Sequence, residues 1–308
     1  MDRPYVLHVF TPAKHVSPFD VNMAYDAGWT AVAPYHGVEL DDVATLVQDA
    51  IFSRGPKGVK RTGIFIGGRN MQLAMDMLEY AREAMVPPFE VSVFADPSGA
   101  FTTAAGMVAA VEHRLRTAHR RELAGQRVVV LGGTGPVGSA AAVLAARAGA
   151  KVVIMGRQKD KADRVAALCS HSFGAELTGI KGDVNEHKAG QLQQADVVLN
   201  TAKAGVQVLT DAEITAAPQL KVAADVNAVP PAGIAGVGLQ DDGAPIAASR
   251  SGAVGIGALA VGNLKYQTQN HLLQAMRTAE TPLYLHFEQA FEFARTFVRS
   301  QPNVRNAG

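Results

Sequence analysis

The sequence has very little cysteine: Cys169 is the single one among 308 residues. One cysteine cannot form a disulfide within the chain, and a zinc site built on thiolates needs several of them. Cys169 lies in a predicted helix with Val165 and Leu168, so we expect it to pack in the core. The nine histidines show neither an H-x-H nor an H-E-x-x-H spacing, so no metal site is expected.

An excess of charge of either sign is also missing. Lysine and arginine number 29 and aspartate and glutamate 28, which gives a formal net charge of +1. A protein that binds nucleic acid or a membrane surface usually carries a basic excess, so neither partner is expected. The chain has no apolar run of about 18 residues that could span a membrane, and no charged segment followed by a long apolar one near its start. We therefore expect a cytoplasmic protein.

Short runs of β-branched residues alternate with amphipathic segments along the chain. This alternation predicts an α/β fold with parallel strands. The polar segment 120–126 precedes a second series of strands and helices, so we expect two open, mostly parallel sheets. The predicted domains are an N-terminal α/β domain over residues 1–120 and a second domain over residues 121–279.

Two segments interrupt the alternation. Residues 228–262 contain Pro230, Pro231 and many glycines, so they are expected to be rich in loops. The final segment is helical and has no strand of its own. We therefore expect a C-terminal helix over residues 280–300 that returns to pack on the first domain.

A glycine-rich turn follows the predicted buried strand 128–131 and directly opens a helix. The motif G-x-G-x-x-G is formed by Gly133, Thr134, Gly135, Pro136, Val137 and Gly138. In dinucleotide-binding folds the first glycine makes the turn, the second lets backbone approach the pyrophosphate, and the third lets helix and strand pack closely. The alternative is an ordinary turn that binds nothing. Because strand and helix flank the motif, we expect a Rossmann-type NAD(P)-binding domain.

The end of the next predicted strand bears on the choice of dinucleotide. A domain that binds NAD carries an acid there, about 20 residues after the glycines, for the ribose 2′-hydroxyl. Here Arg157 stands in that place, and Lys159 and Lys161 follow. Arg157 and Lys161 suit the oxygens of a 2′-phosphate, so NADP is favoured and NAD remains open. The alternative is a solvated helix start, because Asp160 and Asp163 are interspersed.

The chain lacks a G-x-S-x-G nucleophile turn and a P-loop, which favours hydride transfer through a bound nicotinamide. In open α/β sheets, ligands bind beyond the carboxyl ends of the strands, where loops of both domains would meet in a cleft. Several of these residues also have a structural alternative, such as charging a helix start, forming a plain turn or lying in solvent. The candidates at or near these ends are Asp20, Asp96, Thr102, Ala202, Asn227, Gly257 and Lys265.

Five segments together resemble a known family. They are residues 17–26 (SPFDVNMAYD), 96–103 (DPSGAFTT), 132–138 (GGTGPVG), 225–231 (DVNAVPP) and 255–269 (GIGALAVGNLKYQTQ). With them the chain resembles the bacterial methylene-tetrahydromethanopterin dehydrogenases of methylotrophs over nearly its whole length. It is more similar to the type that accepts NAD or NADP, although Arg157 and the lysines after it resemble the strictly NADP-dependent type. The two-domain plan also resembles the methylene-tetrahydrofolate dehydrogenases.

The resemblance implies oxidation of the methylene group of methylene-tetrahydromethanopterin to the methenyl form by NADP or NAD, in one-carbon metabolism of formaldehyde. The hydride leaves a carbon between two nitrogens that delocalise the product cation, so this step removes no proton. The resemblance also implies that Lys265 lies at the pterin cleft and that the protein is a homo-oligomer built on trimers. We expect Asp20 to accept from the amino–lactam edge of the pterin and Phe19 to cover a ring face. Asp96 and Thr102 complete the expected substrate site.

Three other functions stay open. A methylene-tetrahydrofolate dehydrogenase would use the same chemistry on a folate carrier. A shikimate-type dehydrogenase shares the two-domain plan but reduces a carbonyl, and it needs a lysine–aspartate pair to handle a proton. A protein that senses NADP without catalysis would need only the dinucleotide site.

Overall fold

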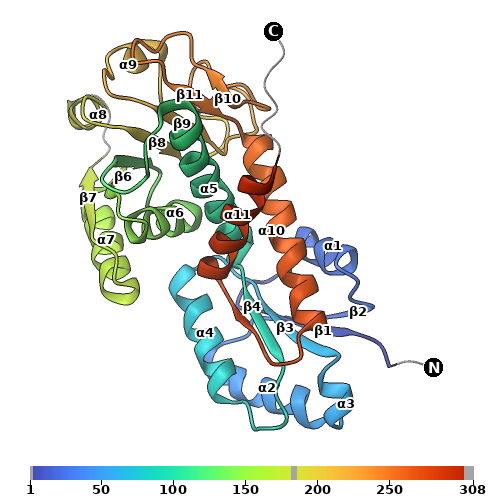
Figure 1. Cartoon of the computed structure of the whole chain (residues 1–308). Helices are drawn as coiled ribbons and strands as arrows, with labels where there is room; N and C mark the ends of the chain where they lie inside the picture. The colour runs from blue at the N-terminus through green and yellow to red at the C-terminus, as the bar shows by residue number, and fades with distance from the viewer. Residues whose placement is uncertain (1–2, 182–185, 302–308) are drawn as a thin grey trace. The chain divides into compact units, whose positions relative to one another are not determined.

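In the computed structural model, which describes residues 3–181 and 186–301, the strands gather into two separate sheets (Figure 1). The chain divides accordingly into two compact units. The first comprises the described residues up to Thr102 together with Tyr266–Ala290, and the second comprises Thr103–Lys265 and the described chain from Phe291 onward. Two open, mostly parallel sheets confirm the predicted fold class.

The first unit is built on a parallel sheet with the strand order β12-β4-β3-β1-β2. All five residues of β3 are buried, as expected for a strand covered on both faces. The strands are β1 (Val6–Thr11), β2 (Ala31–His36), β3 (Thr62–Ile66), β4 (Ser92–Ala95) and β12 (Tyr284–Leu285). The helices are α1 (Pro18–Asp26), α2 (Val43–Phe52), α3 (Pro56–Val59) and α4 (Met71–Glu83), with short 3-10 turns at Leu40–Asp42 and Pro97–Gly99.

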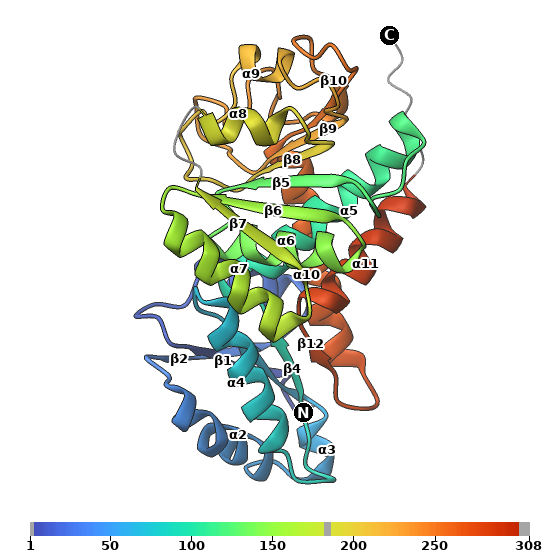
Figure 2. The ribbon, with the colours of Figure 1, turned by 90° about the vertical axis from the view of Figure 1, so that its left-hand side faces the viewer.

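The second unit has a sheet of order β10-β11-β9-β8-β5-β6-β7, and its one antiparallel pair among the described strands is β10 with β11. Its strands are β5 (Arg127–Leu131), β6 (Lys151–Gly156), β7 (Leu177–Lys181), β8 (Val197–Asn200), β9 (Val222–Asp225), β10 (Asp242–Pro245) and β11 (Val254–Ile256). Figure 2 shows β5, β6 and β7 side by side.

Strand order reverses at β5, because the chain continues to β6 on one side and returns to β8 on the other. Ligands bind at such a switch point in doubly wound sheets. The helices with residues in this unit are α5 (Ala100–His119), α6 (Pro136–Arg147), α7 (Lys159–Phe173), α8 (Glu186–Leu192), α9 (Asp211–Thr215), α10 (Ala258–Thr278) and α11 (Phe287–Ser300). The glycine turn between β5 and α6 therefore lies at the place where this fold binds ligands.

Three helices, α5, α10 and α11, have residues in both units. The sequence predicted domain limits at 120/121 and 279/280, whereas the chain passes from one unit to the other at 102/103, 265/266 and 290/291. Composition indicated the polar joint, but α5 and α10 are 20 and 21 residues long and run from one compact unit into the other. A boundary inside a continuous helix leaves no turn residues in the sequence to mark it.

The C-terminal segment is divided between the two units. The predicted helix 280–300 was expected on the first domain; its residues up to Ala290 belong to the first unit, and those from Phe291 onward belong to the second. There Arg295 of α11 donates from Nε to Oε2 of the buried Glu112 of α5, over 2.8 Å. The part in the first unit includes the short strand β12, which pairs with β4, and the start of α11 up to Ala290. Within the expected loops of 228–262 the structure has the short strands β10 and β11. The sequence of β10, DGAP, contains a glycine and a proline, which are uncommon inside strands.

Candidate functional site

The turn between β5 and α6 exposes the start of a helix. Gly132 has φ +75°, a left-handed conformation that glycine adopts without strain. Gly135 is the N-cap of α6, with no hydrogen bond from a side chain to the cap, and Pro136 follows it. The first N–H groups of α6 therefore have no capping side chain. Such a helix start attracts an anionic group, because N–H donors and the helix dipole point outward.

Packing explains two of the motif glycines and leaves the third unexplained. A Cβ on Gly138 would lie 2.5 Å from Thr201 Oγ1 and 2.7 Å from Gly133 Cα, and one on Gly133 would lie 2.7 Å from Ile154 Cβ. A Cβ on Gly135 would meet only Gly132 O, at an ordinary 3.5 Å, and φ there is −90°. The fold itself does not need glycine at 135. A ligand that approaches the backbone closely does need it, and the residues present therefore fit a dinucleotide pyrophosphate.

A cavity of about 490 Å³ opens beside this turn, within the size range of small-molecule sites. Arg157 lies at its wall, is exposed, and makes no hydrogen bond or ion pair that the described residues show. Lys161 is exposed but does not line the cavity. Lys159 pairs with Asp163, whose hydrogen bond raises the pKa of the lysine. Lys203 also lines the cavity, is exposed, and shows no partner among the described residues, so Arg157 and Lys203 are both available cations here. The lining includes Gly132, Thr134, Gly135, Lys188, Thr201 and Ala202.

A buried polar network holds the loops after β8 and β9. Asp225 accepts from Asn200 Nδ2 (2.8 Å) and from the backbone N–H groups of Asn227 (2.9 Å) and Ile234 (2.9 Å). Asn200 Oδ1 accepts from the N–H of Ala202, which lines the cavity (3.0 Å). Buried polar groups that find their partners in this way fix one conformation. The network sets the loop that faces the glycine turn.

Asn227 and Gly257 were both predicted to bind the cofactor. In the structure their contacts lie outside the lining of the cavity. Asn227 Oδ1 accepts from the N–H of Gly205 (3.1 Å), and its Nδ2 donates to Pro231 O (2.8 Å). A Cβ on Gly257 would lie 2.0 Å from Gly238 O, so backbone contact requires glycine there. Neither residue is part of the cavity lining. In this structure both hold loops together.

The first unit has a second cavity, of about 520 Å³, beyond the carboxyl ends of β1 and β3. Asp20, in the first turn of α1, lines it and is only 6% exposed. Gln269 donates from Nε2 to Asp20 Oδ1 over 2.9 Å. Lys14 and Arg69, both exposed, line the same cavity. The nearly buried carboxylate of Asp20 and the exposed cations Lys14 and Arg69 therefore line the same cavity.

Asp96 and Thr102 hold the start of α5. Asp96 Oδ1 accepts from the N–H groups of Phe101 (2.9 Å) and Thr102 (3.2 Å), and Oδ2 accepts from Thr102 Oγ1 (2.6 Å). Both residues are fully buried and absent from the cavity lining. Ser98 between them lines the cavity, with φ +55° and Oγ donating to Gly68 O (2.7 Å). The hydrogen bonds of Asp96 and Thr102 thus fix the backbone next to Ser98, which lines the cavity of the first unit.

The remaining candidates lie in helices α1 and α10. Phe19 is 42% exposed and directly precedes Asp20. Lys265 is half-buried in α10, four residues before Gln269. Residues four apart share one face of a helix, so Lys265 and Gln269 belong to the same stripe of α10.

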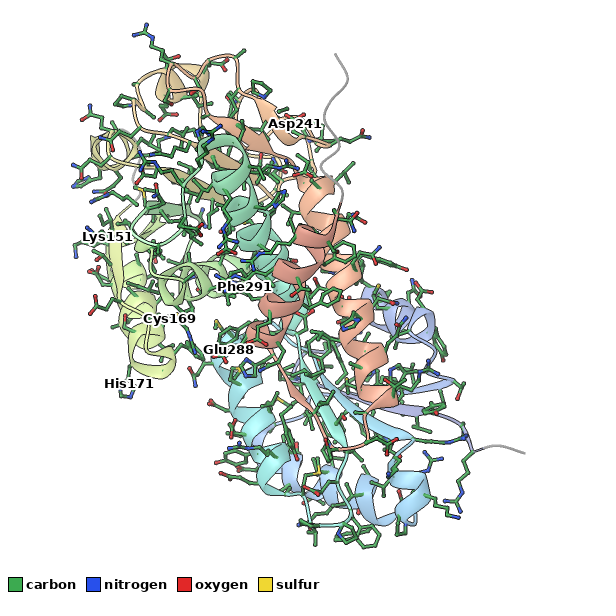
Figure 3. The ribbon with its side chains drawn as sticks, viewed as in Figure 1. Lys151, Cys169, His171, Asp241, Glu288 and Phe291 are labelled. Carbon is green, nitrogen blue, oxygen red and sulfur yellow. The ribbon has the colours of Figure 1, made fainter. Side chains whose placement is uncertain are left out.

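Other chemistries find little support among the described residues. Cys169 is buried on α7 (Figure 3), and burial raises the pKa of its thiol to about 11. It is therefore protonated at neutral pH and a poor nucleophile. Over residues 3–181 and 186–301, no group of three or more His, Cys, Asp and Glu side chains is arranged to hold a metal ion. None of the described helices has the length and apolarity to cross a membrane.

Comparison with known proteins decides the family. The family model for methylene-tetrahydromethanopterin dehydrogenase, N-terminal, matches residues 18–98. The NAD(P)-dependent methylenetetrahydromethanopterin dehydrogenase of Methylorubrum extorquens is 47% identical over 290 residues, which cover 94% of this chain and 97% of that protein. The chain belongs to the methylene-tetrahydromethanopterin dehydrogenase family.

Two further comparisons give a second relative and a solved structure of similar fold. The bifunctional protein MdtA of Methylorubrum extorquens is 35% identical over 244 residues, or 79% of this chain and 83% of that protein. Quinate dehydrogenase from Corynebacterium glutamicum, solved in complex with NAD, has a TM-score of 0.55 at 15% identity and covers 96% of this chain and 99% of its own. That structure shows the shared dehydrogenase fold alone. The resemblance found in the sequence is confirmed.

For this member of the methylene-tetrahydromethanopterin dehydrogenase family, the glycine geometry predicts opposite results for two alanine substitutions. Gly138→Ala forces a Cβ against Thr201 and Gly133, so we expect the free energy of unfolding to fall by about 1–3 kcal/mol relative to the wild type. Gly135→Ala meets only an ordinary contact, so its stability should stay within about 0.5 kcal/mol. Urea unfolding followed by circular dichroism measures both. Equal losses would show that packing, rather than a ligand, requires Gly135.

Proposed function

We propose that this chain transfers a hydride from the methylene group of methylene-tetrahydromethanopterin to NADP or NAD and releases the methenyl form. The observation that carries the proposal is Gly135, a glycine that the fold does not need, at the mouth of a cavity at the sheet's switch point. The name of the 47% identical relative, which is NAD(P)-dependent, supports it.

On the dinucleotide side, the start of α6 binds the pyrophosphate, with Gly133, Thr134, Gly135, Pro136, Val137 and Gly138 forming its cradle. Arg157 meets the 2′-phosphate of NADP, assisted by Lys161, because a guanidinium matches phosphate oxygens. Ala202 lies in the facing loop, and Asn227 and Gly257 keep the neighbouring loops in place. When bound, the nicotinamide ring supplies the hydride acceptor.

On the substrate side, Asp20 accepts hydrogen bonds from the amino–lactam edge of the pterin, and Phe19 covers a ring face. Lys265 donates to an oxygen or nitrogen of the carrier, and its place one helical turn before Gln269, a partner of Asp20, supports a shared task. Asp96 and Thr102 contribute by fixing the loop that contains Ser98. No proton leaves in the hydride step, so these residues act by position and charge.

We further propose that the enzyme works in the cytoplasm, in one-carbon metabolism of formaldehyde, as a homo-oligomer built on trimers. The family resemblance supports these points. The folate carrier is the nearest alternative substrate, since its methylene bridge also lies between two nitrogens.

The function is tested by following the absorbance of reduced cofactor when the protein meets NADP and methylene-tetrahydromethanopterin. We expect turnover with this carrier, and slower or absent turnover with methylene-tetrahydrofolate. Gly135→Val, which places two methyl groups where the pyrophosphate binds, should abolish binding of both dinucleotides in calorimetry. A folded but inactive wild type, or faster turnover with quinate or shikimate, would contradict the proposal.

Arg157→Ala separates the two dinucleotides. If Arg157 holds the 2′-phosphate by charge-assisted hydrogen bonds, the variant should bind NADP about 10- to 100-fold more weakly, while NAD binding hardly changes. Lys159→Ala is the matched control, because Lys159 already pairs with Asp163 and should leave both affinities near the wild type. Isothermal titration with each dinucleotide gives the result. Equal losses for NADP and NAD would mean that Arg157 has a structural role.

Asp20→Asn and Lys265→Met test the substrate site. Each should lower kcat/KM for the methylene carrier by about 100-fold, because a small misplacement of the reacting carbon is costly. NADP affinity should survive both changes. Asp26→Asn, on the same helix α1 but exposed, is the matched control and should keep full turnover. If Asp20→Asn lowers the melting temperature while the folded fraction keeps wild-type turnover, Asp20 only supports its helix.

A further inference from the structure

Gln269 is a buried residue to which the proposed function assigns no task of its own. It lies in α10 with 0% of its surface exposed. Its Nε2 donates to Oδ1 of Asp20 over 2.9 Å, although the two residues are 249 positions apart in the sequence. Asp20 lines the cavity of the first unit, whereas Gln269 stands behind it and is absent from the lining. The amide therefore reaches the cavity only through the carboxylate.

The other end of the same amide has no partner. Gln269 Oε1 is buried and makes no hydrogen bond with any residue that the structure describes. A buried acceptor without a donor costs about 1–3 kcal/mol of stability. Turning the amide over would bring Oε1 against the carboxylate of Asp20, two acceptors facing each other. The observed orientation thus keeps the contact with Asp20 at the expense of Oε1.

The hydrogen bond is not needed to dock α10 on its sheet. Trp29, which is 2% exposed, donates from Nε1 to the backbone oxygen of Leu273 in the next turn of α10, over 3.1 Å. Leu273 and Met276 of the same helix are buried in the unit. Apolar burial and the tryptophan bond already hold the helix. A leucine at 269 would remove the unpartnered oxygen and would also take one donor from Asp20, so its two effects on stability oppose each other while the docking contacts stay.

We propose that Gln269 is a positioning residue that fixes the plane of the Asp20 carboxylate for recognition of the pterin's amino–lactam edge. The proposal rests on the proposed function, because it assigns Gln269 a role through Asp20. A carboxylate that accepts two neighbouring N–H groups must be held within about 10–20° of the right plane. An N–H donor on one oxygen restricts rotation of the short aspartate side chain. Because the amide is neutral, it does this without adding charge to the site.

Polarisation adds to the geometric effect. A chain of hydrogen bonds from the Gln269 amide to the carboxylate, and from substrate N–H groups to the same carboxylate, is cooperative in a site shielded from water. Glutamate at 269 would set two carboxylates against each other, and lysine would neutralise the charge on Asp20. Glutamine is the side chain of this length that donates and stays uncharged.

The test compares Gln269→Leu with Gln274→Leu, a matched change at an exposed glutamine on the same helix. We expect Gln269→Leu to raise KM for methylene-tetrahydromethanopterin about tenfold or more, with a smaller change in kcat. NADP affinity and melting temperature should match the wild type, and Gln274→Leu should match it in every respect. Gln269→Met, which keeps the length of the side chain but not the donor, should behave like Gln269→Leu.

A double-mutant cycle shows whether Gln269 acts through Asp20. In the Asp20→Asn background, Gln269→Leu should cause almost no further rise in KM, because the group that it positions has already been altered. Independent, multiplicative effects would overturn the proposal, as would a KM change of less than about twofold in the single variant. Unfolding of both Gln269→Leu and Gln269→Met at low temperature would also overturn it, by showing a role in the fold.

The same measurements separate this inference from the proposed function. A wild type that neither binds nor oxidises the methylene carrier defeats the proposed function, and the role of Gln269 falls with it. A wild type that oxidises the carrier, with Gln269→Leu equally active, defeats the inference alone. If the wild type binds the carrier without turnover, fluorescence titration of the wild type and of Gln269→Leu measures the same loss of affinity as a rise in Kd.

Discussion

Backbone must lie directly against backbone where the β5–α6 turn meets the loop after β8, and the second unit is arranged around this contact. A Cβ on Gly132 would lie 2.6 Å from the backbone of Ala202, and one on Gly138 would touch Thr201. Only glycine permits that approach. The approach fixes the direction of α6, and with it the place where its unpartnered N–H groups meet a ligand. The glycine turn and the loop after β8 both line the cavity of about 490 Å³.

The buried polar network of Asn200, Asp225 and Asn227 also fixes the loops at this edge of the sheet, through hydrogen bonds and not through close packing. Asn200, Asp225 and Asn227 follow or end neighbouring strands, and each bonds to backbone in a loop rather than to solvent. The first unit uses a similar device, since Asp96 binds the start of α5 and shapes the loop before it. In both units, carboxylates and amides near the strand ends organise backbone, and fewer side chains are left to meet a ligand.

Periodicity was enough to predict the two parallel sheets and most of their strands, because buried strands and amphipathic helices have distinct repeats. It could not find β10, β11 or β12, which are two to four residues long, nor unit boundaries inside continuous helices. Motif spacing predicted the glycine turn and reserved its second glycine, Gly135, for close approach of a ligand, and packing does not require glycine at that position. An aspartate that caps a helix and one that lines a cavity look alike in sequence, as Asp96 and Asp20 illustrate. Gln269 was missed because its partner lies 249 positions away.

The strand β12 has a consequence for how such a chain reaches its native state. It pairs with β4 at the border of the first sheet, yet it is separated from β4 by the entire second sheet in the sequence. During synthesis, the N-terminal sheet stays one strand short until residues beyond 280 have emerged from the ribosome. Until then the border of β4 presents unpaired N–H and C=O groups, which invite pairing with other chains. The unit that is translated first is thus the one that must wait longest for its last strand.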